Sequence, residues 1–268
     1  MKTLFLFLIG FTTIIVMAEP DLDDPKTLKK ITKEALSFER IQIRDKEGEK
    51  LAYPESSPYP YTGWVVQKKK PRFLFYSKEG RQHGPVIQWY KNDQKRSEVY
   101  YKEGLIHGDF IIWYENGQKS VEANYKDGKK DGHEISWDEK GAKKYACIYI
   151  DGKLNGLATK WDEEGQKITE TLYQDGKEHG IKTRWWWPGG SKTEMHYEHG
   201  ELRKLVDWHT NGKKRLVKHY KGNGTLHGLW AEWDEQGNKT FEAIYTDGSP
   251  PKHIRDAEVE SWSEMLGL

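Results

Sequence analysis

The chain has 268 residues, of which only 35% are hydrophobic while 12 are tryptophan and 15 are tyrosine. Apolar surface concentrated in a few large rings favours a thin structure over one with a deep core. The 43 lysine and arginine residues nearly cancel the 42 aspartate and glutamate residues, so the composition shows no basic surface of the kind that binds nucleic acid. The one basic run, KKKPR at residues 68–72, is expected to be a solvated edge.

Residues 1–18 are expected to be a secretory signal peptide. Lys2 precedes an apolar run at residues 4–16, and the small residues up to Ala18 suit a cleavage site. The run is shorter than the ~20 residues that span a bilayer, which argues against an uncleaved anchor. We therefore expect export to the periplasm or the cell exterior, with no membrane span left after cleavage. The single cysteine, Cys147, excludes an intramolecular disulfide and is expected to be a small buried residue.

The segments 19–47 and 48–79 are expected to cap the N-terminal end of a repeat array. Asp24 and Pro25 favour the start of a helix, and residues 48–79 contain a degenerate, shortened version of the repeat that follows. The apolar residues on one side of the predicted helix are Leu28, Ile31, Ala35 and Leu36.

Residues 80–248 consist of seven units of 24 residues, each opened by a glycine at position 1. Glycine also recurs at positions 5 and 14 of most units. In the sixth unit Trp208 and Gly212 come one residue early, and an insertion before Gly224 restores the frame. Position 10 holds the tryptophans Trp89, Trp113, Trp137, Trp161, Trp185 and Trp233. Position 22 holds the tyrosines Tyr101, Tyr125, Tyr149, Tyr173, Tyr197 and Tyr245.

Each unit is expected to form a β-hairpin. Apolar residues alternate at positions 6, 8 and 10, and again at positions 20 and 22, whereas position 19 is usually glutamate. This pattern predicts one apolar face that contains the tryptophans and tyrosines, and one charged face. Leu157 and Ile181 at position 6 are assigned to the apolar face.

The connections between the expected strands have the chemistry of tight turns. Asn116–Gly117 lies within a unit and Asp127–Gly128 lies between units, and such pairs supply the positive φ values that hairpin turns need. The prediction is an all-β fold, an antiparallel meander or solenoid of hairpins with short helical caps at one or both ends. Residues 249–268 form the C-terminal cap, in which we expect a helix at 254–266 that packs through Trp262.

The unit from Gly104 to Lys119, with the pattern Gly-x-x-His-Gly-x4-Trp-Tyr-x2-Gly-Gln-Lys, resembles the bacterial variant of the MORN repeat. The resemblance extends over positions 80–248 and implies a β-hairpin repeat fold with an interaction role. Many bacterial chains of this kind are grouped as antitoxins of toxin–antitoxin systems. An export signal is not expected of a cytosolic antitoxin.

The sequence predicts no catalytic, metal or cofactor site. His83, His107, His179 and His227 share position 4, but equivalent residues of neighbouring hairpins lie nearly 10 Å apart, too far to share one metal ion. We expect a polar turn position instead. The glutamates of position 19 are expected to form a solvated charged face, and the chain has no motif of a nucleophilic or phosphate-binding enzyme.

The residues expected to form an interaction surface are those that deviate from the repeat or lie at position 11. They are Tyr90, Tyr114, Trp186, Trp187 and Trp208. The regular tryptophans and tyrosines are expected to be structural. The favoured function is a non-enzymatic scaffold for an unidentified protein partner; the alternatives are a glycan- or cell-wall-binding module and an antitoxin or immunity protein.

Overall fold

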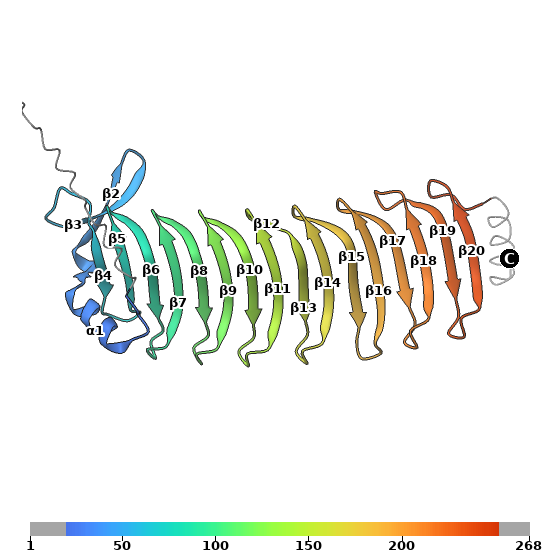
Figure 1. The fold of residues 1–268 in the computed structure, drawn as a ribbon, viewed down its shortest axis with the longest axis horizontal. Helices are drawn as coiled ribbons and strands as arrows, with labels where there is room; N and C mark the ends of the chain where they lie inside the picture. The colour runs from blue at the N-terminus through green and yellow to red at the C-terminus, as the bar shows by residue number, and fades with distance from the viewer. Residues whose placement is uncertain (1–19, 252–268) are drawn as a thin grey trace, which may run out of the picture.

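The computed structural model describes residues 20–251, which form one long, single-layered antiparallel sheet with a short helix at its N-terminal end (Figure 1). This confirms the predicted all-β meander of hairpins. The sheet has 18 strands, and β4 to β20 are joined in chain order. The expected signal peptide at 1–18 and the expected helix at 254–266 lie outside the described residues.

The N-terminal part contains the one α-helix of residues 20–251 and a separate two-stranded sheet. Helix α1 begins where predicted, because the Asp24 carboxylate accepts hydrogen bonds from the Lys26 and Thr27 backbone N–H groups. Strand β1 pairs in parallel with β4, while β2 and β3 form their own hairpin. The elements are α1 (Pro25–Glu34), β1 (Leu36–Ser37), a 3-10 helix η1 (Phe38–Arg40), β2 (Ile41–Lys46), β3 (Glu49–Pro54), β4 (Gly63–Gln67) and β5 (Phe73–Lys78).

The repeats supply the remaining strands. These are β6 (Arg81–Trp89), β7 (Lys95–Lys102), β8 (Leu105–Trp113), β9 (Lys119–Lys126), β10 (Lys129–Trp137), β11 (Lys143–Ile150), β12 (Lys153–Leu154), β13 (Gly156–Trp161), β14 (Lys167–Gln174), β15 (Lys177–Trp186), β16 (Ser191–Glu198), β17 (Glu201–Trp208), β18 (Lys214–Tyr220), β19 (Leu226–Trp233) and β20 (Lys239–Tyr245).

The turns between units adopt the conformation that their sequence predicts. Asp127 and Gly128 have φ values of 49° and 83°, as a hairpin turn with two left-handed residues requires. The N–H of Gly128 also donates to the carbonyl of Ile106 in the preceding unit at 2.8 Å. The same bond recurs at the other inter-unit turns except the one at Gly224, and it ties each of these turns to the unit before it.

The glycine at position 5 has a packing role besides its positive φ. A Cβ on Gly132 would lie 2.9 Å from the Asn124 Cβ of the preceding unit, and one on Gly156 would lie 3.6 Å from Ile148. The side chain at position 21 therefore lies over the next unit's glycine, so that adjacent units approach closely.

The strand register corrects the expected assignment of the two faces. In the hairpin β8–β9, Ile111 lies opposite Glu122 and Trp113 lies opposite Lys119, whereas Phe110 lies opposite Ala123. Directly opposed residues share a face, so position 10 and position 19 lie on one face and positions 20 and 22 on the other. We call these the tryptophan face and the tyrosine face. The prediction of one apolar and one charged face was wrong, because both faces mix rings with charges.

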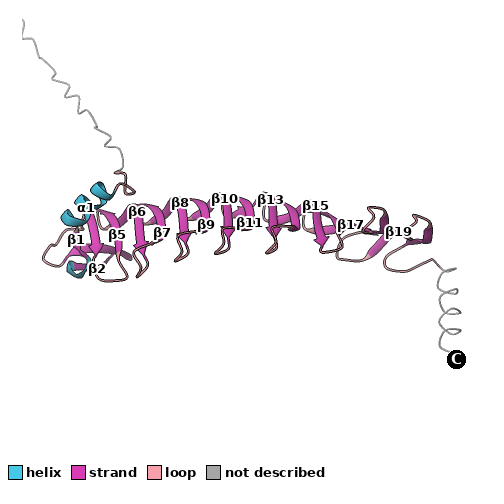
Figure 2. Cartoon of the chain, turned by 90° about the horizontal axis from the view of Figure 1, so that it is seen from below, coloured by secondary structure: helices cyan, strands magenta, loops and turns pink. Residues whose placement is uncertain are grey.

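Among residues 20–251, the two faces are covered by other elements at the N-terminal end. On the tryptophan face Leu74, Ile87 and Trp89 pack with Leu28 and Ile31 of α1. On the tyrosine face a second cluster gathers Val65, Phe75 and Val86 with Ile41 and Tyr61 as half-buried neighbours. Figure 2 shows α1 at that end, and from β8 onward the strands form one layer.

In the single-layered part most of the buried residues are small and lie at the strand centres. Ala123 is 1% exposed and Cys147 is 3% exposed, as expected for that cysteine. The repeat tryptophans and tyrosines are half-buried apart from Trp89 and Tyr245, which are buried. Their rings and the aliphatic stems of neighbouring lysines cover the small buried residues, as a second layer does in a two-layered fold. For example, the Lys130 Nζ atom lies 5.0 Å from the centre of the Tyr149 ring.

Candidate interaction surface

Tyr90 and Tyr114, expected to be exposed, are half-buried and link adjacent units. The Tyr90 hydroxyl donates to the carbonyl of Trp113 at 2.7 Å, and that of Tyr114 donates to the carbonyl of Trp137 at 2.9 Å. The expectation of exposed rings was wrong because position 11 lies at a strand end, within reach of the next hairpin. Where position 11 is aspartate, as at Asp138, the side chain instead accepts backbone hydrogen bonds from its own turn.

Trp186 and Trp187 are the exposed rings among the expected interaction residues, each with 46% of its surface accessible. The Trp186 Nε1–H donates to Thr193 Oγ1 at 3.0 Å, and the Arg184 guanidinium lies 4.0 Å from the centre of its ring. The Trp187 Nε1–H reaches back to the carbonyl of Lys167 at 2.9 Å. Both indoles are thus held by one hydrogen bond while their rings remain open to solvent.

Trp208 is half-buried beside a cleft of about 320 Å³ that Trp186 also lines. The Lys192 ammonium lies 5.1 Å from the centre of the Trp208 ring. Asp207 lines the same cleft and accepts hydrogen bonds from Thr193 at 2.5 Å and from Arg215 at 2.6 Å. The cleft combines two indoles with a carboxylate and a guanidinium, groups that can bind a polar ring.

A row of four aliphatic residues on the tryptophan face is the surface that sequence reasoning missed. Leu157 lies opposite Leu172 across β13 and β14, and both are accessible, at 45% and 38%. Ile148 covers Gly156 next to Leu157, and Leu172 covers Gly180 next to Ile181. The aliphatic row Ile148–Leu157–Leu172–Ile181 is therefore continuous across β11, β13, β14 and β15.

The aliphatic row corrects the expectation that position 6 is core, because Leu157 and Ile181 are exposed. The signal was present in the sequence, since apolar residues fill position 21 at Ile148 and Leu172 and position 6 at Leu157 and Ile181 in successive middle units. The last unit also has apolar residues at both positions, Leu229 and Ile244. Recognising it required the pairing of position 6 with position 21, which the structure supplies.

Ion pairs flank the aliphatic row on the same face. Lys119 pairs with Glu122 and Lys167 with Glu170, both at 2.6 Å. The hydrogen bond from Lys119 holds the pKa of the Glu122 carboxyl below its usual range. Position 19 therefore has the charged character predicted for it, although it lies on the same face as the tryptophans.

The polar and titratable groups of the middle units have structural contacts. Burial raises the pKa of the Cys147 thiol and of the neighbouring Tyr145 and Tyr149 phenols, which keeps all three protonated at neutral pH. At position 4, His107 Nδ1 contacts the Asp127 carboxylate of its own unit's turn at 3.0 Å. Within residues 20–251 no group of three histidine, cysteine, aspartate or glutamate side chains is placed to hold a metal ion.

The fold and this surface define a β-repeat scaffold of hairpins. The MORN repeat variant family matches residues 82–103 and 106–127, which confirms the resemblance for the first two units. No curated protein matches the chain.

Among solved structures, the chain is similar to alternansucrase in complex with isomaltononaose, at 15% identity and a TM-score of 0.20. The match covers 72% of this chain and 18% of that one, so the chain spans less than a fifth of the enzyme's length.

Proposed function

We propose that this chain is an exported, non-enzymatic scaffold that binds a protein partner through the tryptophan face of its middle repeats, in the cell envelope or outside the cell. The aliphatic row carries the proposal. Four adjacent aliphatic side chains, 38–47% exposed, lie on a single-layered sheet within a border of ion pairs. An apolar centre with a charged rim is the usual anatomy of a protein interface, and contiguous exposed apolar residues mark such sites.

The sequence supports the other parts of the proposal. Export rests on residues 1–18, and among residues 20–251 no helix has the length and apolar character to cross a membrane. We propose that the chain is not an enzyme, because the titratable groups described above have structural contacts: they bond to turns, form ion pairs or pack against the strands.

The proposed surface is tested with two variants that place changes on opposite faces of the β13–β14 hairpin. Leu157→Glu combined with Leu172→Glu places charges in the aliphatic row, while Lys160→Glu changes an exposed residue on the tyrosine face of β13. Tagged chains are cross-linked in cells, and the proteins recovered from the envelope fraction are quantified. We expect a partner that is recovered with the wild type and Lys160→Glu but lost with the double variant. Equal recovery with all three chains would contradict the proposal.

Export is tested separately by fractionating cells that express the tagged chain. The scaffold proposal requires the chain in the periplasm or medium, and retention in the cytoplasm would contradict this part alone.

A glycan-binding role is the second candidate, favoured by the cleft at Trp186 and Trp208. Exposed indoles can stack on sugar rings, and the Asp207–Arg215 pair can hydrogen-bond hydroxyls. Retention on insoluble cell-wall polysaccharide that is lost in Trp186→Ala but kept in Leu157→Glu/Leu172→Glu would favour it over the protein partner. An antitoxin or immunity role rests on the repeat family alone and predicts that the chain rescues cells from a toxin encoded beside it.

A further inference from the structure

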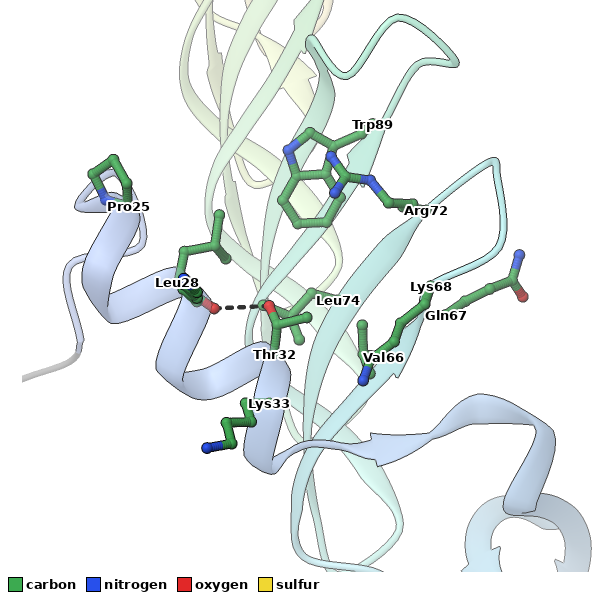
Figure 3. A pocket seen from close by; sticks show the side chains of 11 residues that line it. Pro25, Leu28, Thr32, Lys33, Val66, Gln67, Lys68, Arg72, Leu74 and Trp89 are labelled. Carbon is green, nitrogen blue, oxygen red and sulfur yellow. Dashed lines mark hydrogen bonds between the residues drawn. The ribbon is translucent and has the colours of Figure 1, made fainter.

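A cavity of about 590 Å³ lies between α1 and the first strands of the sheet, far along the chain from the aliphatic row (Figure 3). Its floor is apolar. Leu74 is fully buried, Val66 is 4% exposed and Trp89 is 8% exposed, and Leu28 of α1 faces them. The volume falls within the range of ~300–1,000 Å³ that small-molecule sites occupy.

The ionisable side chains that line the cavity are all cations. Lys29 and Lys33 come from α1, and Lys68 and Arg72 come from the β4–β5 connection. No carboxylate lines it, although the whole chain has almost as many acidic as basic residues. Within residues 20–251 none of the three lysines forms an ion pair, so their charges are available to a ligand.

Arg72 is positioned to direct one end of such a ligand. Its guanidinium lies over the Trp89 ring at 5.3 Å and contacts the Asp93 carboxylate at 3.1 Å. Its Nε is buried and has no hydrogen-bond partner in the part of the chain that the structure describes. The rest of the Arg72 side chain is accessible, at 40%, so its terminal N–H groups can donate to an anion in the cavity.

The basic run at residues 68–72 is therefore not only a solvated edge. Lys69 pairs with Glu39 and Lys70 with Asp93, while Lys68 and Arg72 line the cavity. Lys69, Lys70 and Arg72 have acidic partners within the fold, whereas Lys68 has none among the described residues, and Lys68 and Arg72 contribute to an apolar pocket.

We propose that this cavity binds a single-chain anionic amphiphile, a fatty acid whose carboxylate contacts Arg72 and Lys68 and whose alkyl chain lies on Leu28, Val66 and Leu74. The apolar floor provides burial for the chain, and the cationic rim neutralises the carboxylate. The inference goes beyond the scaffold function and does not depend on it, because the two sites share no residue.

The binding test uses the purified chain and a fluorescent 18-carbon polyene fatty acid, displaced by laurate. Dodecanol has the same alkyl chain without the charge, and acetate has the charge without the chain. We expect laurate to displace the probe, dodecanol to do so about tenfold less well, and acetate to have no effect. Equal displacement by dodecanol and laurate would overturn the anionic part of the proposal, and displacement by acetate would overturn the amphiphilic part.

Substitutions of residues that line the cavity test whether the probe binds there. Thr32→Trp fills it from α1 without changing a charge and should abolish binding, while Arg72→Gln should weaken laurate about tenfold. Because Arg72 also contacts Asp93, Lys68→Gln provides a second loss of charge that leaves that contact intact. Lys143→Gln, an exposed lysine of β11, is the control and should bind as the wild type does.

Unchanged binding in Thr32→Trp would overturn the location. Association with phosphatidylglycerol vesicles without binding of dissolved laurate would identify a membrane surface as the ligand and would overturn the proposal as well. The protein-capture experiment above measures a different site, so either proposal can fail while the other holds.

Discussion

The strands under α1 and the strands in the middle of the sheet use similar hairpins but are stabilised differently. At the N-terminal end, Leu74 and Ile87 are fully buried because helix and sheet cover them. In the middle, the buried residues are small, such as Ala123 and Cys147, and rings and lysine stems cover them from both sides. A single layer therefore gains stability from contacts between neighbouring units, whereas the covered end has a conventional core.

Removing a large side chain from each region should give the largest difference. Leu74→Ala should destabilise the chain by about 2–5 kcal/mol, because a fully buried leucine leaves a cavity. Leu172→Ala should cost less than about 1 kcal/mol, since its side chain is already 38% exposed. Chemical denaturation followed by tryptophan fluorescence measures both. Similar losses of stability in the two variants would show that the middle repeats also have a buried core, which would contradict this difference.

The glycine of position 5 tests whether close contact between units stabilises the middle. Gly132→Ala should cost about 2 kcal/mol, because it adds a contact with Asn124 Cβ to the strain of a φ of 117°. Gly84→Ala is the matched change at the covered end, where φ is 73° and no atom lies within 4 Å, so only the strain of about 1 kcal/mol remains. Denaturant midpoints compare the two, and a larger loss at Gly84 would argue against the packing role.

The sequence predicts the features of this fold that depend on local chemistry. The Asp–Gly turns, the strand lengths and the helix start at Asp24 follow from residues adjacent in the chain. Face assignment does not, because it depends on how two strands pair. One extra residue in β7 shifts its register with β6, and two extra residues in β8 shift its register with β7. The alternation of residues within a single strand does not reveal these shifts.

The candidate sites show the same division. Trp186 was predicted to be an interaction residue from its place at position 11, and it is exposed. The aliphatic row and the cationic cavity were not, because each is assembled by residues from different hairpins or from a helix packed on the sheet. The bond from Tyr114 to the next unit was missed for the same reason.

Losing that bond should have a moderate effect confined to the middle repeats. Tyr114→Phe removes the hydroxyl that donates to Trp137 and should cost about 1 kcal/mol, since the carbonyl is left without this donor. Tyr59→Phe is the control, because that ring is 75% exposed and should change stability by less than about 0.5 kcal/mol. Hydrogen exchange of β9 and β10 should accelerate in Tyr114→Phe, and unchanged exchange there would contradict a link between units.

The ion pairs beside the aliphatic row should have the smallest effect on the free energy of unfolding, and its dependence on pH measures that effect. Because the pKa of Glu122 is lowered in the folded chain by the Lys119 hydrogen bond, the pair stabilises the fold above the unfolded value of about 4.5. Its contribution of less than about 1 kcal/mol should disappear as the pH falls through the lowered folded value, where the carboxyl is protonated in both states. Glu122→Gln should therefore be less stable than the wild type at pH 7 and equal to it at pH 2. A difference that persists at pH 2 would mean that Glu122 stabilises the sheet by packing its stem over the strands and not by its charge.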